Sequence, residues 1–304
     1  MGWRERPLLE LFRKRALSDP SVPVGPGDDC ALLLYGGKPV AVTTDMIEQD
    51  VDFRAVDSPY KVGWKAIMIS ASDLVATGCR PKHFLVASKI PREWDSERLD
   101  LLLAGLYDAC ERLGASLVGG DISAGSPLLL VSTGLGEPWG DAPILRSGAR
   151  PGDDIFVSGP LGGSILGRHL EFVPRMAFGE ELACNGLVTA MMDISDGLSG
   201  DLLHIADCSN VDFTVIAQDI PIHEDAVALS SRDGILPIVH ALSDGEDFEL
   251  LFTAPPDSEQ HLIDAASKTL TPLRRIGTIT PAGTGRSLFI NGENEPWRVT
   301  SYEH

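Results

Sequence analysis

The sequence of 304 residues is poor in positive charge. It has 25 Lys and Arg residues against 44 Asp and Glu residues, and its formal net charge is -19. A field of this sign repels nucleic acids and anionic lipids unless a local basic patch overrides it. The densest basic stretch, residues 13–15, lies in a segment with helical spacing of apolar residues and is interpreted as a solvated helix surface. Neither a nucleic acid nor a membrane is therefore expected as a partner.

Long apolar runs and paired cysteines are also missing. No stretch approaches the ~20 apolar residues that span a bilayer. The five cysteines are widely separated, odd in number and form no C-x-x-C pair, so free thiols in a reducing compartment fit better than disulfides or a zinc site. Charges interrupt the apolar residues at the N-terminus, unlike in a signal peptide. A cytoplasmic protein is expected.

Several motifs of nucleotide and hydrolytic enzymes do not occur. The sequence has no G-x-x-x-x-G-K-[ST] loop, no H-R-D or D-F-G segment, no G-x-S-x-G elbow and no H-E-x-x-H pair. These absences exclude a P-loop enzyme, a protein kinase of the usual type, an α/β-hydrolase and a zincin protease.

What is present is a globular composition, with 43% hydrophobic residues, in which short apolar runs alternate with helical patterns. Helices are predicted over 62–76, 96–113, 162–170 and 198–206. Strands are predicted over 31–34, 39–43, 84–88, 116–118, 128–135, 155–157, 190–194, 211–216, 249–253 and 287–290. The polar segment 146–154, with Gly and Pro, is the expected boundary between two α+β domains with mixed sheets and packed helices.

Acidic residues recur where these strands begin or end. Asp29 precedes a predicted strand, Asp45 and Asp121 follow predicted strands, and Asp193 lies at the end of one. Asp73 lies inside an apolar helix. Taken singly, such acids are usually turn residues or helix caps. Together they indicate more, because buried carboxylates need partners, and the neighbours here are acids and hydroxyls rather than Lys or Arg. Oxygen ligands of this kind favour Mg²⁺ or Ca²⁺, and Mg²⁺ would let an acidic protein hold a polyphosphate.

In their order and spacing these motifs resemble those of the thiamine-monophosphate kinase family, within the larger group that includes aminoimidazole ribonucleotide synthetase. The matching segments extend over most of the chain: GDDCA (27–31), TTDM (43–46), GWKA (63–66), SDL (72–74), GGD (119–121), RSGA (146–149), DISDGL (193–198) and GEDFEL (245–250). The resemblance implies a two-domain aminoimidazole ribonucleotide synthetase-like architecture. Residues 1–148 would form the N-terminal ATP- and Mg-binding and dimerisation domain. Residues 149–304 would form the C-terminal domain, which completes the nucleotide and substrate site.

The resemblance also implies an activity and its residues. The family transfers the γ-phosphoryl group of ATP to thiamine monophosphate, which is the last step of thiamine diphosphate biosynthesis, and forms homodimers. By resemblance, several Mg²⁺ ions would be held by Asp29, Thr43, Thr44, Asp45, Asp73, Asp121, Asp193 and Asp196. ATP would contact Tyr107, Gly120, Arg146 and Ser195. The thiamine side would be met by Asp52, Glu246 and Tyr302. No protein nucleophile is nominated, because the acceptor is already an anionic phosphate oxygen.

Three positions depart from the family pattern: Asp52 stands where His is usual, Ser70 stands where Asn is usual, and residues 167–174 are a shortened segment. An ionised Asp52 cannot donate a hydrogen bond to a phosphate, so Asp52→His is expected to lower the Michaelis constant for thiamine monophosphate. Two alternatives stay open. One is another ATP-dependent enzyme of the same group, and the other is a non-catalytic nucleotide-binding regulatory module.

Overall fold

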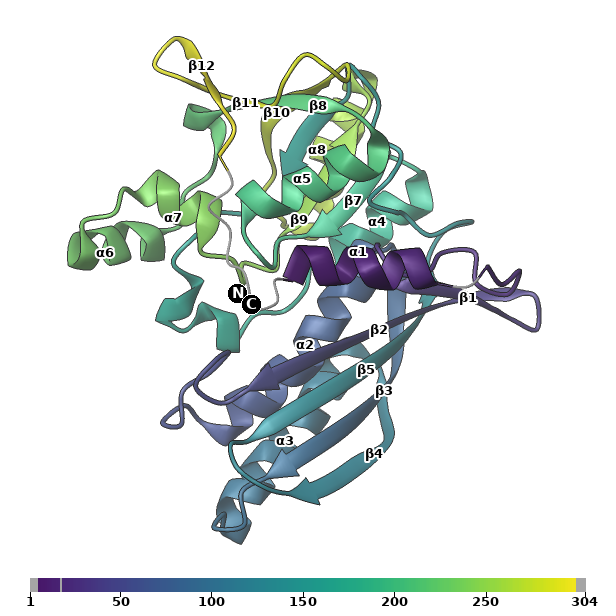
Figure 1. Ribbon diagram of the computed structural model, residues 1–304, viewed down its shortest axis with the longest axis vertical. Coiled ribbons are helices and arrows are strands. Elements are labelled where there is room, and N and C mark those ends of the chain that lie inside the picture. Colours follow the sequence, from purple (N-terminus) through teal and green to yellow (C-terminus); the bar gives the residue numbers. More distant parts are fainter. Residues whose placement is uncertain (1–4, 17, 299–304) are drawn as a thin grey trace.

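The computed structural model describes residues 5–16 and 18–298, which form two β-sheets placed one above the other with helices packed on them (Figure 1). The five-stranded sheet has the order β1-β2-β5-β3-β4, and the seven-stranded sheet has the order β12-β11-β8-β10-β6-β9-β7. Both sheets mix parallel and antiparallel pairs. This is the α+β class expected from the sequence. The sheets lie on either side of the expected domain boundary between residues 148 and 149, which itself stays a prediction.

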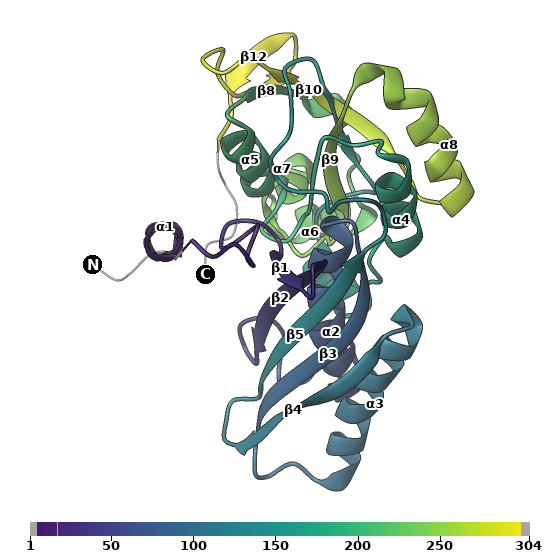
Figure 2. The same cartoon turned by 90° about the vertical axis from the view of Figure 1, so that its right-hand side faces the viewer.

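The first sheet is built from residues before that boundary. Its strands are β1 (Ala31–Tyr35), β2 (Lys38–Glu48), β3 (Cys79–Ile90), β4 (Ser116–Ala124) and β5 (Leu129–Pro138). Its helices are α2 (Pro59–Ala76) and α3 (Ser96–Leu113), and α1 (Glu5–Arg15) lies to one side, away from the strands, in Figure 2. Helix α3 begins after Asp95, whose side chain accepts from the Arg98 N–H, and ends at Gly114 in the left-handed conformation.

Two glycines let α2 and α3 touch. A Cβ on Gly63 would lie 2.3 Å from the Leu102 carbonyl oxygen, and a Cβ on Gly105 would lie 1.9 Å from the Tyr60 carbonyl oxygen. Gly63, part of a segment that resembles the kinase family, therefore has a packing role.

One face of the first sheet is covered by α2 and α3, and the other is open (Figure 1, Figure 2). Strand register aligns Met46, Val131, Ala87 and Asp121 across β2, β5, β3 and β4. Side chains at aligned positions point to the same face. Met46 is 59% exposed, and Leu85, which alternates with the buried Phe84 and Val86, is 38% exposed. The aligned row, Asp121 included, therefore belongs to the open face.

The second sheet is covered on both faces. Its strands are β6 (Asp154–Val157), β7 (Ala190–Asp193), β8 (Asp212–Ile216), β9 (Leu250–Ala254), β10 (Arg274–Thr280), β11 (Ser287–Ile290) and β12 (Glu293–Pro296). Its helices are α4 (Met176–Asn185), α5 (Leu198–Ser209), α6 (Glu224–Asp233), α7 (Pro237–Ser243) and α8 (Glu259–Thr269). Met191 joins the core beside α4 and α8, while Met192 joins the core beside α5. All four residues of β7 are therefore buried.

The structure corrects several expectations. The segment 162–170 is not a helix but two 3₁₀ turns, η1 (Ser164–Leu166) and η2 (Arg168–Leu170), and two more 3₁₀ turns are η3 (Ala217–Asp219) and η4 (Pro256–Ser258). Strands β10 and β12 were not predicted, because RRIGTIT and ENEP lack the apolar alternation of a strand; pairing with β6 and β8 and with β11 makes them strands.

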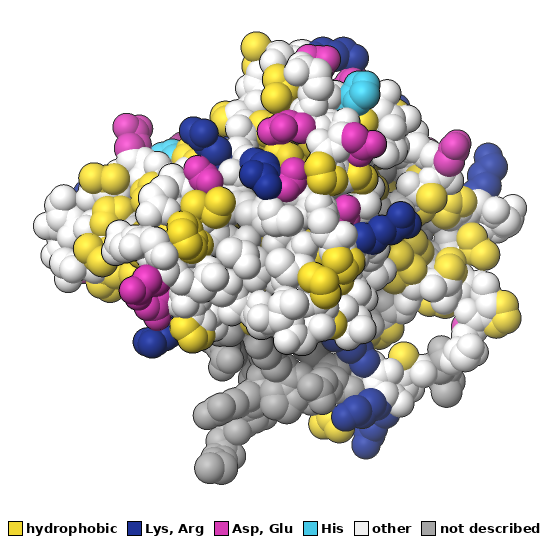
Figure 3. All heavy atoms as spheres, turned by 90° about the horizontal axis from the view of Figure 1, so that it is seen from above, with side chains coloured by type: hydrophobic (Ala, Val, Ile, Leu, Met, Phe, Trp, Pro, Cys, Tyr) yellow, Lys and Arg dark blue, Asp and Glu magenta, His cyan; other side chains and the backbone are white. Residues whose placement is uncertain are grey.

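The helices, the cysteines and the surface charges agree with what the composition predicts. In the part of the chain that the structure describes, no helix is both long and apolar enough to cross a bilayer. All five cysteines are free thiols, as expected, and Cys30, Cys79 and Cys110 are buried. Acidic and basic side chains are interspersed on the face shown in Figure 3, which is the pattern of a solvated surface.

Candidate metal and nucleotide site

Three buried or half-buried carboxylates converge where the two sheets meet. Asp29 precedes β1, Asp73 lies in the last turns of α2, and Asp193 ends β7; one oxygen of each lies within 4.8 Å of the others. Sequence analysis named all three, and the structure brings them together from segments far apart in the chain. Their role as metal ligands stays a prediction.

Hydroxyl groups fix the orientation of these acids. Thr43 Oγ1 donates to Asp73 Oδ2 at 2.5 Å, and Ser72 Oγ donates to Asp193 Oδ2. Asp45 belongs to the same region, because its Oδ2 accepts from Ser70 Oγ at 2.7 Å. Ser70 and Ser72 are buried residues of α2, so one helix positions two of the carboxylates from outside the cluster.

Arg146 supplies positive charge at one side of the cluster. Its guanidinium donates to Asp29 Oδ1 from Nε at 3.0 Å and from Nη2 at 2.5 Å, and its backbone N–H donates to Asp28. Asp29 Oδ2, although buried, has no hydrogen-bond partner within the described residues. A buried carboxylate oxygen left in this way is where a cation ligand fits.

Burial raises the pKa of these carboxyl groups. Desolvation raises the pKa of Asp193 to about 7, and that of Asp45 to about 6. Burial, followed by repulsion from Asp45 and Asp193, raises the pKa of Asp73 well above its usual value. Burial also raises the pKa of Asp29, against the opposing effect of Arg146. Divalent cations would favour the ionised forms, so the donor set fits a hard cation such as Mg²⁺.

These shifts predict how stability depends on pH. The folded protein holds protons on Asp193 up to about pH 7, whereas the unfolded chain releases them near the ordinary value of 3.8. The folded state therefore binds more protons between these limits, and the metal-free protein should lose stability as pH rises through this window. Thermal melting in chelator should show a falling midpoint from about pH 5 to about pH 8.

Added Mg²⁺ should raise the melting temperature mainly at the upper end of this pH range. At the lower end, protons compete with the metal for the carboxylates. Asp193→Asn is the matched variant and should flatten the dependence on pH. An equal rise in melting temperature with Mg²⁺ at both ends would contradict a cation site at these acids.

The loop between β7 and α5 was only partly foreseen. Asp201, which is buried, accepts from the backbone N–H groups of Ser195 and Asp196 at 3.1 and 3.2 Å and so shapes the loop. Asp196, Asp201 and His204 form a second group whose possible ligand atoms lie within 4.8 Å of one another. Sequence analysis named Asp196 and Ser195 but not Asp201 or His204. Their spacing of three on an amphipathic helix was the available signal.

Asp45 and Asp121 were expected just after strands, and the structure corrects this. Asp45 lies inside β2 and Asp121 lies inside β4. The pair Gly119-Gly120 does not end the strand: a Cβ on Gly120 would lie 1.9 Å from the Val86 carbonyl oxygen, so glycine lets β4 continue against β3.

The two acids also lie on opposite faces of the sheet. Asp45 bonds to Ser70 of α2, whereas Asp121 is aligned with Met46 on the open face. Three strand spacings, ~14 Å, separate β2 from β4. Within one chain the structure therefore does not bring Asp121 or Gly120 to the cluster. Tyr107 is 57% exposed on α3, and Thr44 is exposed on the open face of β2.

Two of the three residues predicted for the acceptor side, Asp52 and Glu246, meet at a lysine. Lys65 of α2 donates to the Asp52 carbonyl oxygen at 2.8 Å and to the Glu246 carboxylate. The Asp52 carboxylate accepts from the Glu48 N–H at 2.7 Å, while Arg54 pairs with Asp57 and Lys61 with Glu171. Asp52 thus stabilises its own turn. Tyr302 lies outside the described residues.

The arrangement combines a shielded set of oxygen ligands with one guanidinium and a loop at the N-terminus of α5. Such a site can bind divalent cations together with an anionic phosphate chain. It holds the ligand types for metal-assisted phosphoryl transfer.

Two family models match the chain. The AIR synthase related protein N-terminal domain matches residues 27–137, and the AIR synthase related protein C-terminal domain matches residues 155–289. Over 285 residues the chain is 35% identical to the thiamine-monophosphate kinase of Rhodopirellula baltica, covering 90% of this chain and 89% of that protein. Over 302 residues it is 35% identical to the thiamine-monophosphate kinase of Methanospirillum hungatei, covering 96% of each.

A solved structure of AaThiL complexed with AMPPCP and TMP has the same architecture. It matches with a TM-score of 0.85 at 29% sequence identity, covering 99% of this chain and 97% of that chain. The aminoimidazole ribonucleotide synthetase-like fold expected from the sequence is therefore confirmed.

Proposed function

Because the chain belongs to the thiamine-monophosphate kinase family of AIR synthase related proteins, we propose that it phosphorylates thiamine monophosphate to thiamine diphosphate with ATP and Mg²⁺. The observation that carries the proposal is the buried cluster of Asp29, Asp73 and Asp193, whose raised pKa values and unpaired oxygen suit a cation. The similar AaThiL structure is complexed with AMPPCP and TMP, which supports binding of both a nucleotide and TMP by this chain.

The residues of this chain would position charge rather than attack the substrate. Asp29, Asp73 and Asp193 would hold Mg²⁺, with Asp45, Thr43 and the DISDG loop nearby. Bound Mg²⁺ supplies neutralisation of the charge on the transferred phosphoryl group. The hydroxyls of Ser70, Ser72 and Thr43 keep the carboxylates fixed before substrate arrives, so little reorganisation accompanies the reaction.

Arg146 and Ser195 lie beside the acids and would contact ATP. Arg146 already carries a hydrogen-bonded guanidinium at Asp29, and Ser195 belongs to the loop that Asp201 shapes. Glu246 and Tyr302 would face the thiamine side, together with the turn at Asp52. The free thiols support a reducing compartment, and we place the enzyme in the cytoplasm.

A homodimer would complete the site. The open face of the first sheet exposes Met46 and Leu85, and it carries Asp121 on the edge strand β4. If two copies pack these faces about a two-fold axis along the strands, β4 of one copy lies beside β1 and β2 of the other. Thr44, Asp121, Gly120 and Tyr107 would then serve a site shared between subunits.

The function is tested by a phosphotransfer assay. Purified protein with ATP, thiamine monophosphate and Mg²⁺ should produce thiamine diphosphate and ADP in equal amounts, and a chelator should abolish both. ATP hydrolysis without thiamine diphosphate would point to another enzyme of the group. Binding of ATP and Mg²⁺ without turnover would support a regulatory module.

A further inference from the structure

Lys65 is a charged residue that the phosphotransfer scheme above leaves without a role. Its side chain is 0% exposed, although its ammonium group belongs to the most strongly hydrated kind of side chain. It comes from the middle of α2 and bonds to two segments far apart in the chain: the Asp52 turn and the loop that carries Glu246. Both segments are those assigned above to the acceptor side.

The two partners of the Lys65–Glu246 ion pair differ in their exposure to solvent. The Glu246 side chain is 28% exposed, while Lys65 is fully covered. The carboxylate therefore lies between the ammonium and the open side of the site. Burying a charge is costly, and a purely structural contact between these segments could be made as well by apolar residues. The lysine therefore fixes the place of the Glu246 carboxylate and gives it a cationic partner.

Backbone hydrogen bonds hold the loop that carries Glu246 in place. The Glu246 N–H donates to the Ser195 carbonyl oxygen at 2.7 Å, and the Phe248 N–H donates to that of Ile194 at 2.8 Å. Glu246 and Phe248 have φ values of 53° and 51°, which residues with side chains seldom adopt. Unusual backbone held by several contacts is typical of ligand-binding segments.

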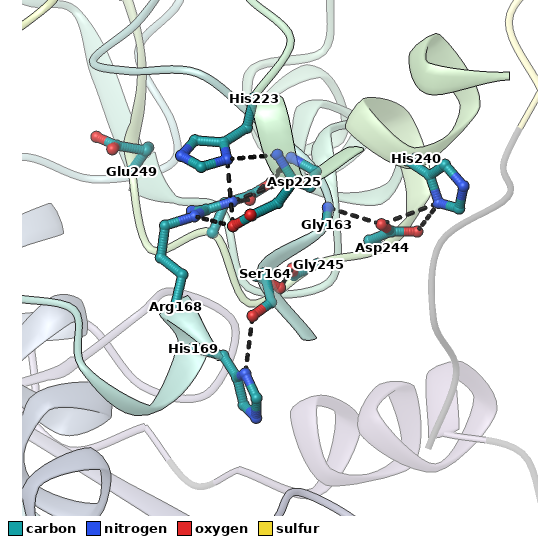
Figure 4. A network of polar contacts seen from close by, with 12 residues as sticks. Gly163, Ser164, Arg168, His169, His223, Asp225, His240, Asp244, Gly245 and Glu249 are labelled. Atoms are coloured by element: carbon teal, nitrogen blue, oxygen red, sulfur yellow. Dashed lines mark hydrogen bonds and ion pairs between the residues drawn. The ribbon is translucent and has the colours of Figure 1, made fainter. Parts of the chain in front are cut away.

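Contacts with Gly163 and Ser164 hold the residues that precede Glu246, as Figure 4 shows. Asp244 accepts from the Gly163 N–H at 2.8 Å and bonds to His240, and Ser164 Oγ donates to the Gly245 carbonyl oxygen at 2.8 Å. With the backbone fixed, the direction of the Glu246 side chain is left to its own partner, which is Lys65.

Helix α2 links this point to the metal cluster. Lys65 precedes Ser72 by seven residues, which is two helical turns, so both side chains lie on one face of the helix, ~10 Å apart along its axis. Ser72 bonds to Asp193, and Lys65 bonds to Glu246. One rigid helix therefore sets the distance between the phosphoryl-transfer end and the acceptor-binding end of the site.

We propose that Lys65 is a positioning residue that aims the Glu246 carboxylate at the cationic, organic end of the acceptor. The inference rests on the proposed function, since the acceptor is taken to be thiamine monophosphate, whose thiazolium ring is positively charged. A carboxylate held in a fixed position attracts a cationic ring, so it should strengthen binding of the acceptor and leave binding of ATP unchanged.

The test is a comparison of Michaelis constants. Lys65→Met keeps the length of the side chain and removes its charge. We expect it to raise the Michaelis constant for thiamine monophosphate about tenfold or more and to leave that for ATP within about twofold. Glu246→Gln should have a similar effect, and the double variant should be no worse than either, because the pair acts as a unit. Lys61→Met, one turn earlier on α2 and paired with the exposed Glu171, is the matched control and should change neither constant.

If Lys65→Met fails to fold, Lys65→Gln replaces it, because glutamine can still donate to the Asp52 carbonyl oxygen. We expect the same result: a higher Michaelis constant for thiamine monophosphate and an almost unchanged one for ATP. Equal rises in both constants would show a general structural role and overturn the proposal. An active wild type with unchanged constants in both Lys65 variants would overturn it as well. A wild type that binds ATP and Mg²⁺ but forms no thiamine diphosphate would instead overturn the proposed function, and the role of Lys65 with it.

Discussion

Asp73→Asn is expected to lower phosphotransfer by about two to four orders of magnitude, because metal-held charge is the main stabiliser of the transferred phosphoryl group. One carboxylate oxygen of Asp73 lies within 4.8 Å of an oxygen of Asp29 and of an oxygen of Asp193. An asparagine keeps its shape and can still accept from Thr43. It removes the negative charge that would hold Mg²⁺.

The fold should survive this change. Neighbouring carboxylates and burial raise the pKa of Asp73, so its ionised form is disfavoured in the metal-free protein. The melting temperature of the variant in chelator should therefore equal or exceed that of the wild type at about pH 8, and added Mg²⁺ should raise it less.

Asp264→Asn, an exposed acid on α8, makes the same change of charge away from the site and should leave activity unchanged. Steady-state assays over a range of Mg²⁺ concentrations measure the effect. Near wild-type activity of Asp73→Asn at every Mg²⁺ concentration would remove this residue from the site.

A mixture of two inactive variants is expected to regain about a quarter of wild-type activity if the site is shared across a two-fold axis. One variant is Asp73→Asn and the other is Asp121→Asn. The two acids occupy opposite faces of the sheet, so Asp121 would serve the cluster of the partner subunit. In a mixed dimer one site carries both changes and the other carries neither. Half of the dimers in a random mixture are mixed, which gives the expected fraction.

Differently tagged subunits, expressed together and purified through both tags, isolate the mixed dimer, which should reach about half of wild-type activity per dimer. Pure Asp73→Asn and pure Asp121→Asn are the controls and should remain inactive. Purified mixed dimers without recovered activity would place Asp121 outside a shared site. A monomeric mass at micromolar concentration would remove the homodimer itself.

Local sequence signals determined much of the fold. The helix 96–113 and the strand 287–290 were predicted with the bounds that the structure has, because a cap, a terminal glycine and a short apolar run mark them within the sequence itself. The strands β2 and β4 were predicted too short, since polar and glycine residues near a functional site imitate strand ends.

The residues alone predicted a site for a hard cation, because carboxylates and hydroxyls stand without Lys or Arg beside them in the sequence, among residues that must be buried. The phosphotransfer followed from the resemblance of the ordered motifs to the kinase family. Which of these groups meet depends on how the whole chain packs. The face on which Asp121 lies depends on strand register across three neighbours, and the bond from Lys65 to Glu246 joins positions 181 residues apart. Neither the face of Asp121 nor the partner of Lys65 has a signal in the neighbouring sequence. The face of a strand residue follows from the two-residue period and from the register of strand pairing, and the partner of a side chain follows from the packing of the whole chain.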